Sequence, residues 1–149
     1  MATRSTIAIE HANGKVQQVY CHWDGYLDHN GKILIEHYKD AAKTAALVAL
    51  GSISSLRREV GEKHNFDERF ERDDPRYQWT TAYHRDRGED LDVHEFKHFE
   101  DYRKNHQYEE YEYILRSNGE WQVATYDDQY KSLADAIAEE MLDNEMAED

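Results

Sequence analysis

Hydrophobic and polar positions near the start of the chain alternate on both sides of an Asn-Gly pair. Residues 3–26 read TRSTIAIEHANGKVQQVYCHWDGY, with β-prone runs flanking Asn13-Gly14. Asn-Gly favours a type I′ turn, because both central residues of that turn need a positive φ. We therefore predict a β-hairpin with a two-residue loop. This register sets Ile9 opposite Gln18, Ile7 opposite Tyr20, Thr6 opposite Cys21, Ser5 opposite His22 and Arg4 opposite Trp23.

The same pattern recurs later in the chain. Residues 108–116 and 120–126 flank Asn118-Gly119, which predicts a second hairpin. Between the two hairpins, residues 77–85 are aromatic and β-branched and predict a further strand. In the second hairpin we expect Ile114 opposite Val123, Tyr113 opposite Ala124 and Tyr111 opposite Tyr126.

Helical patterns occupy the segments between and after these strands. We expect a short helix over 32–38, a second over 41–50 capped by Asp40 and ended by Gly51, and one further turn over 52–56. Residues 93–104 predict another helix, and Ser132 caps a last one. The apolar stripe of that last helix contains Leu133, Ala134, Ile137, Ala138, Met141 and Leu142, and Met146 to Asp149 are expected to fray.

These elements predict an α+β fold in one domain covering residues 1–149. An antiparallel sheet of about five strands, built on the two hairpins, is packed against three to four helices. Residues 57–76 are densely charged and of mixed sign, so we expect a mobile surface loop there. The acidic C-terminus is expected to be frayed.

The net charge of −14 is placed very unevenly along the chain. Residues 1–88 carry 13 acidic and 13 basic side chains, whereas residues 89–149 carry 19 acidic and five basic ones. Nucleic acid and anionic membranes are therefore poor partners for the acidic last part of the chain, and a basic protein surface or a cation is a good one. The single Cys, the lack of a long apolar run and the polar start of the chain lead us to expect a soluble intracellular protein.

One candidate ligand site lies at the end of the first hairpin. Ser5, His22 and Asp24 have the composition of a nucleophile, a base and a carboxylate, but Asp24 follows His22 on the same strand and would lie beside it. We therefore favour binding over catalysis and expect no catalytic residue. Arg85 and Arg87 offer an anion-sized gap, with internal pairing to nearby acids as the alternative. The proposed ligand-binding set is Arg4, Ser5, His22, Trp23, Asp24, Arg85 and Arg87.

The run HEFKH matches the zinc motif H-E-x-x-H. On a helix, His94 and His98 would share one face and could bind zinc, with Glu95 positioning a water. No third ligand stands out, so structural histidines are the favoured interpretation and a metal hydrolase is the weaker one. We expect no cofactor.

Acidic residues form a ridge on the last predicted helix. Asp135, Glu139 and Asp143 follow each other at i, i+4 and i+8, with Glu140 beside them. Successive carboxylates on such a ridge lie about 6 Å apart, comparable to phosphates along a nucleic-acid strand. The ridge is thus either solvated surface or a polyanion mimic. Glu109, Glu110 and Glu112 of the second hairpin are expected to extend the acidic face.

The segments TRSTIAIE, YCHWDGY, NGKILIEHY and ALVALGSISSL resemble a family of small acidic proteins of tailed bacteriophages, and HRDRGED and NGEW extend the similarity. The resemblance implies the cytoplasm of an infected bacterium and brings no catalytic residues with it. Our leading hypothesis is a phage-encoded, non-enzymatic accessory protein for host takeover or anti-defence. It would bind a host protein, as an acidic polyanion mimic that inhibits a nucleic-acid-directed factor. The alternative is a protein that binds a small, nucleotide-like ligand.

Overall fold

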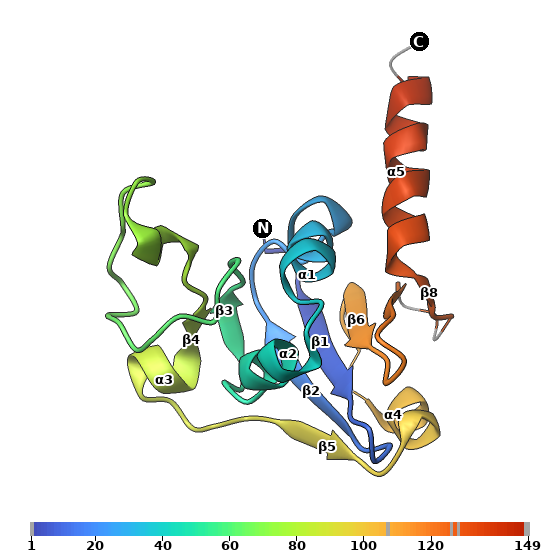
Figure 1. The fold of residues 1–149 in the computed structure, drawn as a ribbon, viewed down its shortest axis with the longest axis horizontal. Helices are drawn as coiled ribbons and strands as arrows, with labels where there is room; N and C mark the ends of the chain where they lie inside the picture. The colour runs from blue at the N-terminus through green and yellow to red at the C-terminus, as the bar shows by residue number, and fades with distance from the viewer. Residues whose placement is uncertain (1, 107, 126, 128, 148–149) are drawn as a thin grey trace.

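The computed structural model describes residues 2–147 except 107, 126 and 128, and the side chains up to Glu145 (Figure 1). The predicted pairing of Tyr111 with Tyr126 lies outside these residues. Of the fraying predicted at 146–149, residues 148–149 also lie outside, whereas the backbone of 146–147 is helical. None of the helices in the described ranges combines the length and the apolar character that a bilayer crossing requires.

Strands β1 (Ser5–Glu10) and β2 (Val16–Cys21) form the first hairpin, shifted by one residue from the predicted register. Ile9 pairs with Gln17, not with Gln18. The reason lies in the turn, where His11 N donates to Lys15 O at 2.8 Å and Gly14 alone has a positive φ, of 90°. The loop therefore has three residues, with the glycine in the left-handed region.

Strands β6 (Tyr111–Leu115) and β7 (Trp121–Ala124) repeat this outcome. Tyr113 pairs with Val123 and Ile114 with Gln122, again one residue from the prediction. Gly119 has a φ of 89°, and Arg116 N donates to Glu120 O at 2.9 Å. The two Asn-Gly sequences thus form the same three-residue turn.

The strands of the described residues belong to one eight-stranded mixed sheet, in which all strands except β5 follow the order β4-β3-β2-β1-β6-β7-β8. The short strands are β3 (Ile53–Ser55), β4 (Thr81–Ala82), β5 (His94–Phe96), which pairs with β2, and β8 (Lys131–Ser132). The α+β class is confirmed. The predicted five-stranded antiparallel sheet is wrong, because β1 pairs with β6 and β2 with β3 in parallel.

The helices agree with the prediction early in the chain and differ later. A π-helix η1 (Leu27–Gly31) leads into α1 (Lys32–His37), and α2 (Ala41–Val48) is capped by Asp40, whose side chain accepts a hydrogen bond from Ala42 N.

The turn predicted at 52–56 is instead β3. The strand predicted at 77–85 is divided among the 3₁₀ helix η2 (Pro75–Gln78), β4 and α3 (Tyr83–Arg87). The helix predicted at 93–104 is divided into β5 and α4 (Phe99–Asn105).

Both faces of the sheet are covered. Ile7, Ile9 and Tyr113 belong to the larger core, which includes Leu34 of α1, Leu47 of α2 and Leu133 at the start of α5 (Leu133–Ala147). Ala8, Val16 and Ile114 point to the opposite face and pack with Tyr102 of α4. Side chains alternate between the two faces along a strand, so Glu112 of β6, which stands between Tyr111 and Tyr113, points to this opposite face and is buried there.

Candidate functional site

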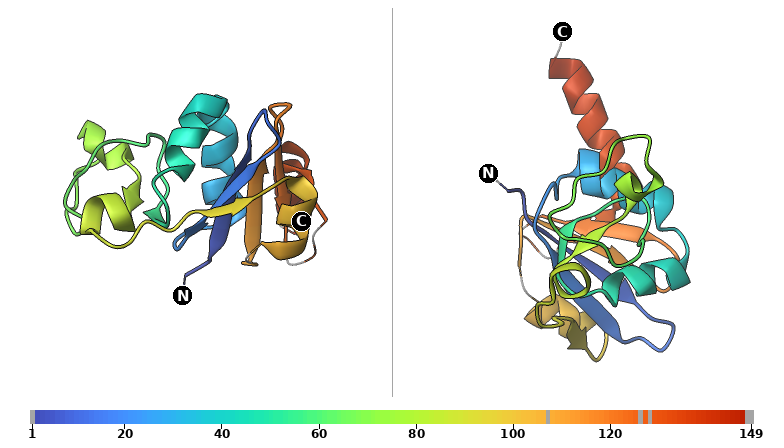
Figure 2. Two further views of the ribbon diagram at one scale, coloured as in Figure 1. Left: turned by 90° about the horizontal axis from the view of Figure 1, so that it is seen from below. Right: turned by 90° about the vertical axis from the view of Figure 1, so that its left-hand side faces the viewer.

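Helix α5 begins in the core and then leaves it. Ser132 Oγ accepts a hydrogen bond from Asp135 N at 3.3 Å, which confirms the predicted cap. Leu133 and Ala136 are buried, and Ile137 packs against the same core. Beyond these turns the helix projects away from the body of the molecule (Figures 1 and 2). The predicted apolar stripe is therefore core only at its beginning.

The projecting part of α5 exposes two large apolar side chains. Met141 and Leu142 are 52 % and 57 % exposed. At about 100° per residue, these two lie on a different side of the helix from the buried Leu133 and Ala136. Together with two exposed alanines they form what we call the apolar strip of α5: Ala134, Ala138, Met141 and Leu142.

Three exposed carboxylates run beside the apolar strip. Asp135, Glu139 and Asp143 occupy positions i, i+4 and i+8 and form the acidic ridge that the sequence predicts. Glu139 bonds to Lys131 at 3.0 Å, but both side chains are more than half exposed, so this ion pair contributes little. The last turn of α5 has no basic residue to offset the helix dipole. The ridge therefore carries negative charge that a basic surface would neutralise.

The other acidic residues assigned to this face lie in different environments. Glu140 is half-buried on α5, and Glu109 and Glu110 are half-buried before β6. Burial raises the pKa of Glu109, with the neighbouring carboxylates adding to the rise and Arg4 opposing it. Glu112 is fully buried and bonds to His106, so its assignment to an exposed acidic face is wrong.

Ser5 and His22 point to opposite faces at the end of the first hairpin. Ser5 pairs with Cys21 and is fully buried, and Asn30 Nδ2 lies 3.4 Å from both Ser5 Oγ and Cys21 Sγ. His22 Nδ1 instead lies 2.6 Å from Tyr20 Oη, on the side of the sheet that faces away from Ser5. The two residues therefore do not form a nucleophile–base pair.

Trp23 and Arg4 are the exposed members of this cluster. The Trp23 side chain is 43 % exposed and meets the His22 ring edge-on, with centroids 4.7 Å apart. Burial raises the pKa of Tyr20, and the charge of Arg4 opposes that rise. Asp24 adopts a φ of +58°, which turns the chain away from the strand. The hairpin end thus presents one aromatic ring and one cation to solvent.

Arg85 and Arg87 both have partners within their own part of the chain. The Arg85 guanidinium donates to the carbonyl oxygens of Val60 at 2.8 Å and Thr80 at 2.5 Å, and it bonds to the Asp86 carboxylate. Arg87 pairs with Glu89 and stacks on the rings of Phe66 and Tyr83. Internal pairing, the alternative considered from the sequence, describes both residues.

The segment from His94 to His98 is not helical. His94 lies on β5, 3.4 Å from an Asp92 oxygen, and His98 Nδ1 accepts a hydrogen bond from Asp101 N at the start of α4. The spacing needed for a shared zinc on one helix face is therefore lost. Among the described residues, no group of three His, Cys, Asp or Glu side chains could hold a metal ion.

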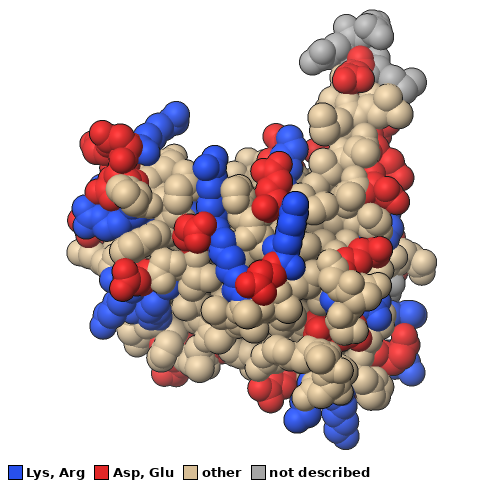
Figure 3. Space-filling view, viewed as in Figure 1, with Lys and Arg blue, Asp and Glu red and all other residues tan. Residues whose placement is uncertain are grey.

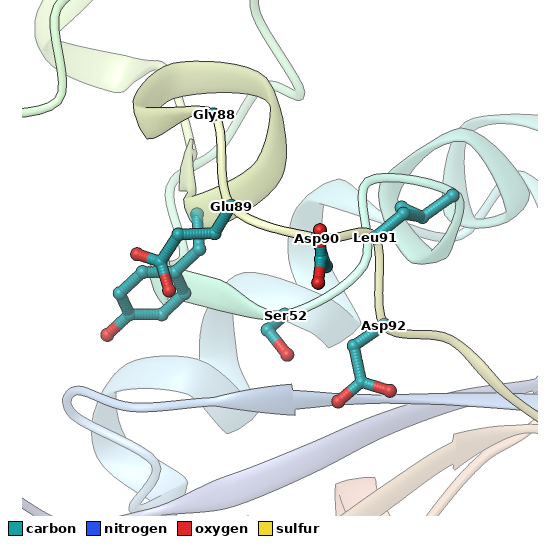
Figure 4. Close-up of a pocket in the computed structure, with 7 residues that line it drawn as sticks. Ser52, Gly88, Glu89, Asp90, Leu91 and Asp92 are labelled. Carbon is teal, nitrogen blue, oxygen red and sulfur yellow. The ribbon is translucent and has the colours of Figure 1, made fainter.

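A hollow of about 680 Å³ lies between α3 and the segment that follows it (Figure 4). Glu89, Asp90 and Asp92 are spaced along the loop that passes Ser52. These three carboxylates are part of the negative charge of residues 89–149. These carboxylates disfavour an anionic ligand in the hollow.

Sequence reasoning missed two groups of residues. The buried pair of His106 and Glu112 was missed because an alternating strand pattern does not show that α4 covers the second face. A cluster of arginines and aromatic residues within 57–81 was missed because its charge density suggested solvated chain. The signal was present in the arginines interleaved with Phe66, Phe70, Tyr77 and Trp79.

Comparison with known proteins gives no match to a family profile, to a curated protein or to a solved structure. The resemblance to proteins of tailed bacteriophages therefore stays a prediction.

Proposed function

We propose that this protein is a non-enzymatic accessory protein that binds another protein through α5. The observation that carries the proposal is the projection of α5 from the body, with Met141 and Leu142 exposed beside the acidic ridge. The partner has an apolar groove bordered by Lys and Arg. In the setting implied by the phage resemblance, that partner is a host protein.

The spacing of the apolar strip supports a helix-in-groove mode of binding. Its members stand at i, i+4, i+7 and i+8, and peptide helices that bind grooves use anchors at such positions. Burying a Met or Leu side chain contributes roughly 1.5–3 kcal/mol each. Met141 and Leu142 are therefore the expected anchors, and the two alanines let the groove approach the helix backbone.

The acidic ridge supports a basic partner. Asp135, Glu139 and Asp143 repel one another at i, i+4 spacing, and a facing row of cations would relieve that repulsion. Figure 3 shows acidic side chains along the described part of α5. The carboxylate spacing favours a partner surface that normally binds nucleic acid, which makes inhibition of a nucleic-acid-directed host or defence factor the proposed outcome.

Charge reversal tests the proposal. The full chain carries Asp135→Lys, Glu139→Lys and Asp143→Lys. The matched control carries Asp67→Lys, Glu71→Lys and Asp73→Lys, which change exposed acids of the 57–81 segment. Tagged proteins are compared for capture from bacterial lysate at about 0.1 M and about 1 M salt, where the Debye length falls from about 10 Å to about 3 Å. A third variant, Leu142→Ser, removes an anchor without changing charge.

We expect wild type and the control to capture the same partner at low salt. The α5 triple variant is expected to lose it, and Leu142→Ser to weaken it by about tenfold or more. Equal capture of the partner by all four proteins, or capture by wild type that is the same at low and high salt, would overturn the proposal. Circular dichroism verifies that α5 remains helical in each variant.

The alternative, a nucleotide-like ligand at the end of the first hairpin, has less support. It needs Arg85 and Arg87 beside Arg4 and Trp23, but both guanidinium groups are engaged by residues of the 57–89 region. A ligand there would have to displace those contacts.

A further inference from the structure

The charged segment 57–81 folds back on itself and forms a small hollow beside β3 and β4. Arg57, Arg69 and Arg76 line it, together with Ser55 and Tyr77. Its volume of about 100 Å³ suits one phosphate-sized group and is well below the size of a pocket for a whole drug-sized ligand. None of the residues in this hollow belongs to α5 or to the end of the first hairpin.

Local contacts hold two of the arginines in place. The Arg57 guanidinium lies over the Tyr77 ring at 4.9 Å, and the backbone N–H of Arg57 donates to Thr80 Oγ1 at 3.0 Å. Arg76 lies over the Phe70 ring at 4.5 Å. Stacking positions both arginines, and for Arg57 it leaves the N–H groups along the edge of the guanidinium available.

The charge balance of the hollow is positive. Among the described residues, no carboxylate lies within ion-pair distance of Arg57 or Arg69, whereas Arg76 pairs with Asp74 at 2.7 Å. The lining contains one carboxylate, that of the exposed Glu68. The chain has a net charge of −14, but these two arginines without an acidic partner make the hollow locally positive.

We propose that this hollow binds the phosphate group of a small molecule. Arg57 and Arg69 supply charge-assisted hydrogen bonds, and Ser55 supplies a neutral donor. A tetrahedral phosphate fits better than a carboxylate, because its several oxygens can accept from two guanidinium forks and a hydroxyl at once. The part of the molecule beyond the phosphate extends outward, since the hollow holds only the phosphate.

Titration of the full chain, followed by its amide chemical shifts, tests this site. The probes are inorganic phosphate, adenosine 5′-monophosphate and adenosine, at constant ionic strength maintained with chloride. The test variant is Arg57→Gln with Arg69→Gln, and the matched control is Arg58→Gln with Arg72→Gln, which removes the same charge from exposed neighbours outside the hollow. The single variant Arg69→Gln provides a second test in case the double variant misfolds, because Arg69 is exposed and its replacement should not disturb the fold.

We expect both phosphate-bearing probes to shift amides within 55–81 and adenosine to shift none. The test variant should bind at least about tenfold more weakly, Arg69→Gln should weaken binding measurably, and the control should stay within about twofold of wild type. Equal affinity for inorganic phosphate and adenosine 5′-monophosphate would show that the site recognises the phosphate alone. Tighter binding of the nucleotide would show that its nucleoside part also contacts the protein. No shifts with either probe, or equal weakening in test and control variants, would overturn the proposal.

Discussion

His106 Nε2 lies 2.8 Å from a carboxylate oxygen of Glu112, and both side chains are fully buried. His106 Nδ1 faces the Tyr102 carbonyl oxygen at 2.7 Å and must donate to it. Nε2 then faces the carboxylate, so the two side chains form one buried hydrogen-bonded pair. Tyr130 Oη donates to the same carboxylate oxygen at 3.2 Å. This network connects α4 to β6 across the second face of the sheet.

Breaking the pair is predicted to destabilise the fold strongly. Glu112→Gln leaves His106 buried against a neutral amide, and the loss of one partner of a buried pair costs about 3 kcal/mol or more. The half-buried neighbour gives the control, because Glu110→Gln should change the free energy of unfolding by only about 0.5 kcal/mol. Urea unfolding measures both. Similar values for the two variants would contradict the buried pairing.

Asp86 predicts a specific loss of stability in acid. Burial raises the pKa of its carboxyl, but hydrogen bonds from Arg85 and from the backbone N–H of Ala82 and His64 outweigh burial and lower that pKa. A depressed folded-state pKa gives stability that is fully present above the unfolded value of about 3.9 and is lost as the pH falls below it.

Asp86→Asn should therefore cost about 2–3 kcal/mol near neutral pH, and the gap between variant and wild type should shrink below about pH 4. The free energy of unfolding measured across this range provides the test. Asp73→Asn, at an exposed position of the nearby segment, is the control and should follow wild type throughout. A gap that stays constant with pH would show that the carboxylate charge is not responsible.

Cys21 is predicted to be unreactive in the folded protein. Burial raises the pKa of its thiol to about 11, and the side chain is fully buried beside Asn30. Because the thiolate is the nucleophile, alkylation by iodoacetamide near neutral pH should be at least about a hundredfold slower in the folded state than in urea. Mass spectrometry after timed quenching follows the reaction. Equal rates in the two states would contradict the burial of this strand.

The sequence predicted the existence of both hairpins but missed their register by one residue. Asn13 was expected to share the positive φ of a two-residue turn, whereas only Gly14 adopts it. Two-residue and three-residue loops use the same Asn-Gly signal, so local chemistry alone does not distinguish them. The shift matters for the site, because it places Ser5 opposite Cys21 and leaves His22 on the other face.

Long-range pairing explains the segments that were predicted wrongly. Residues 94–96 have an apolar spacing compatible with a helix, but they add to the edge of β2 beside Val16. Ile53 likewise becomes a strand residue because Cys21 offers a free edge. By contrast, Asp40 and Ser132 were predicted correctly as caps, since a cap depends on neighbouring residues alone.

The acidic ridge was predicted from sequence, but its exposure and the projection of α5 were not. Asp135, Glu139 and Asp143 follow directly from helical spacing. The hydrophobic pattern of the sequence does not reveal that α5 loses contact with the core after Ile137. It therefore predicts Met141 and Leu142 as core residues, whereas both are exposed. Whether an apolar face is covered depends on the length of the helix relative to the sheet.

Site-specific photocrosslinking from α5 tests the proposed binding mode most directly. A photoreactive phenylalanine analogue replaces Leu142 in the full chain, and the control carries it at Leu91, which is 54 % exposed against 57 % for Leu142. After irradiation in bacterial cells, we predict one dominant crosslinked partner from position 142 that disappears in the Asp135→Lys, Glu139→Lys, Asp143→Lys background and is absent from position 91. Crosslinks of equal yield from both positions, or none from position 142, would contradict a docking role for α5.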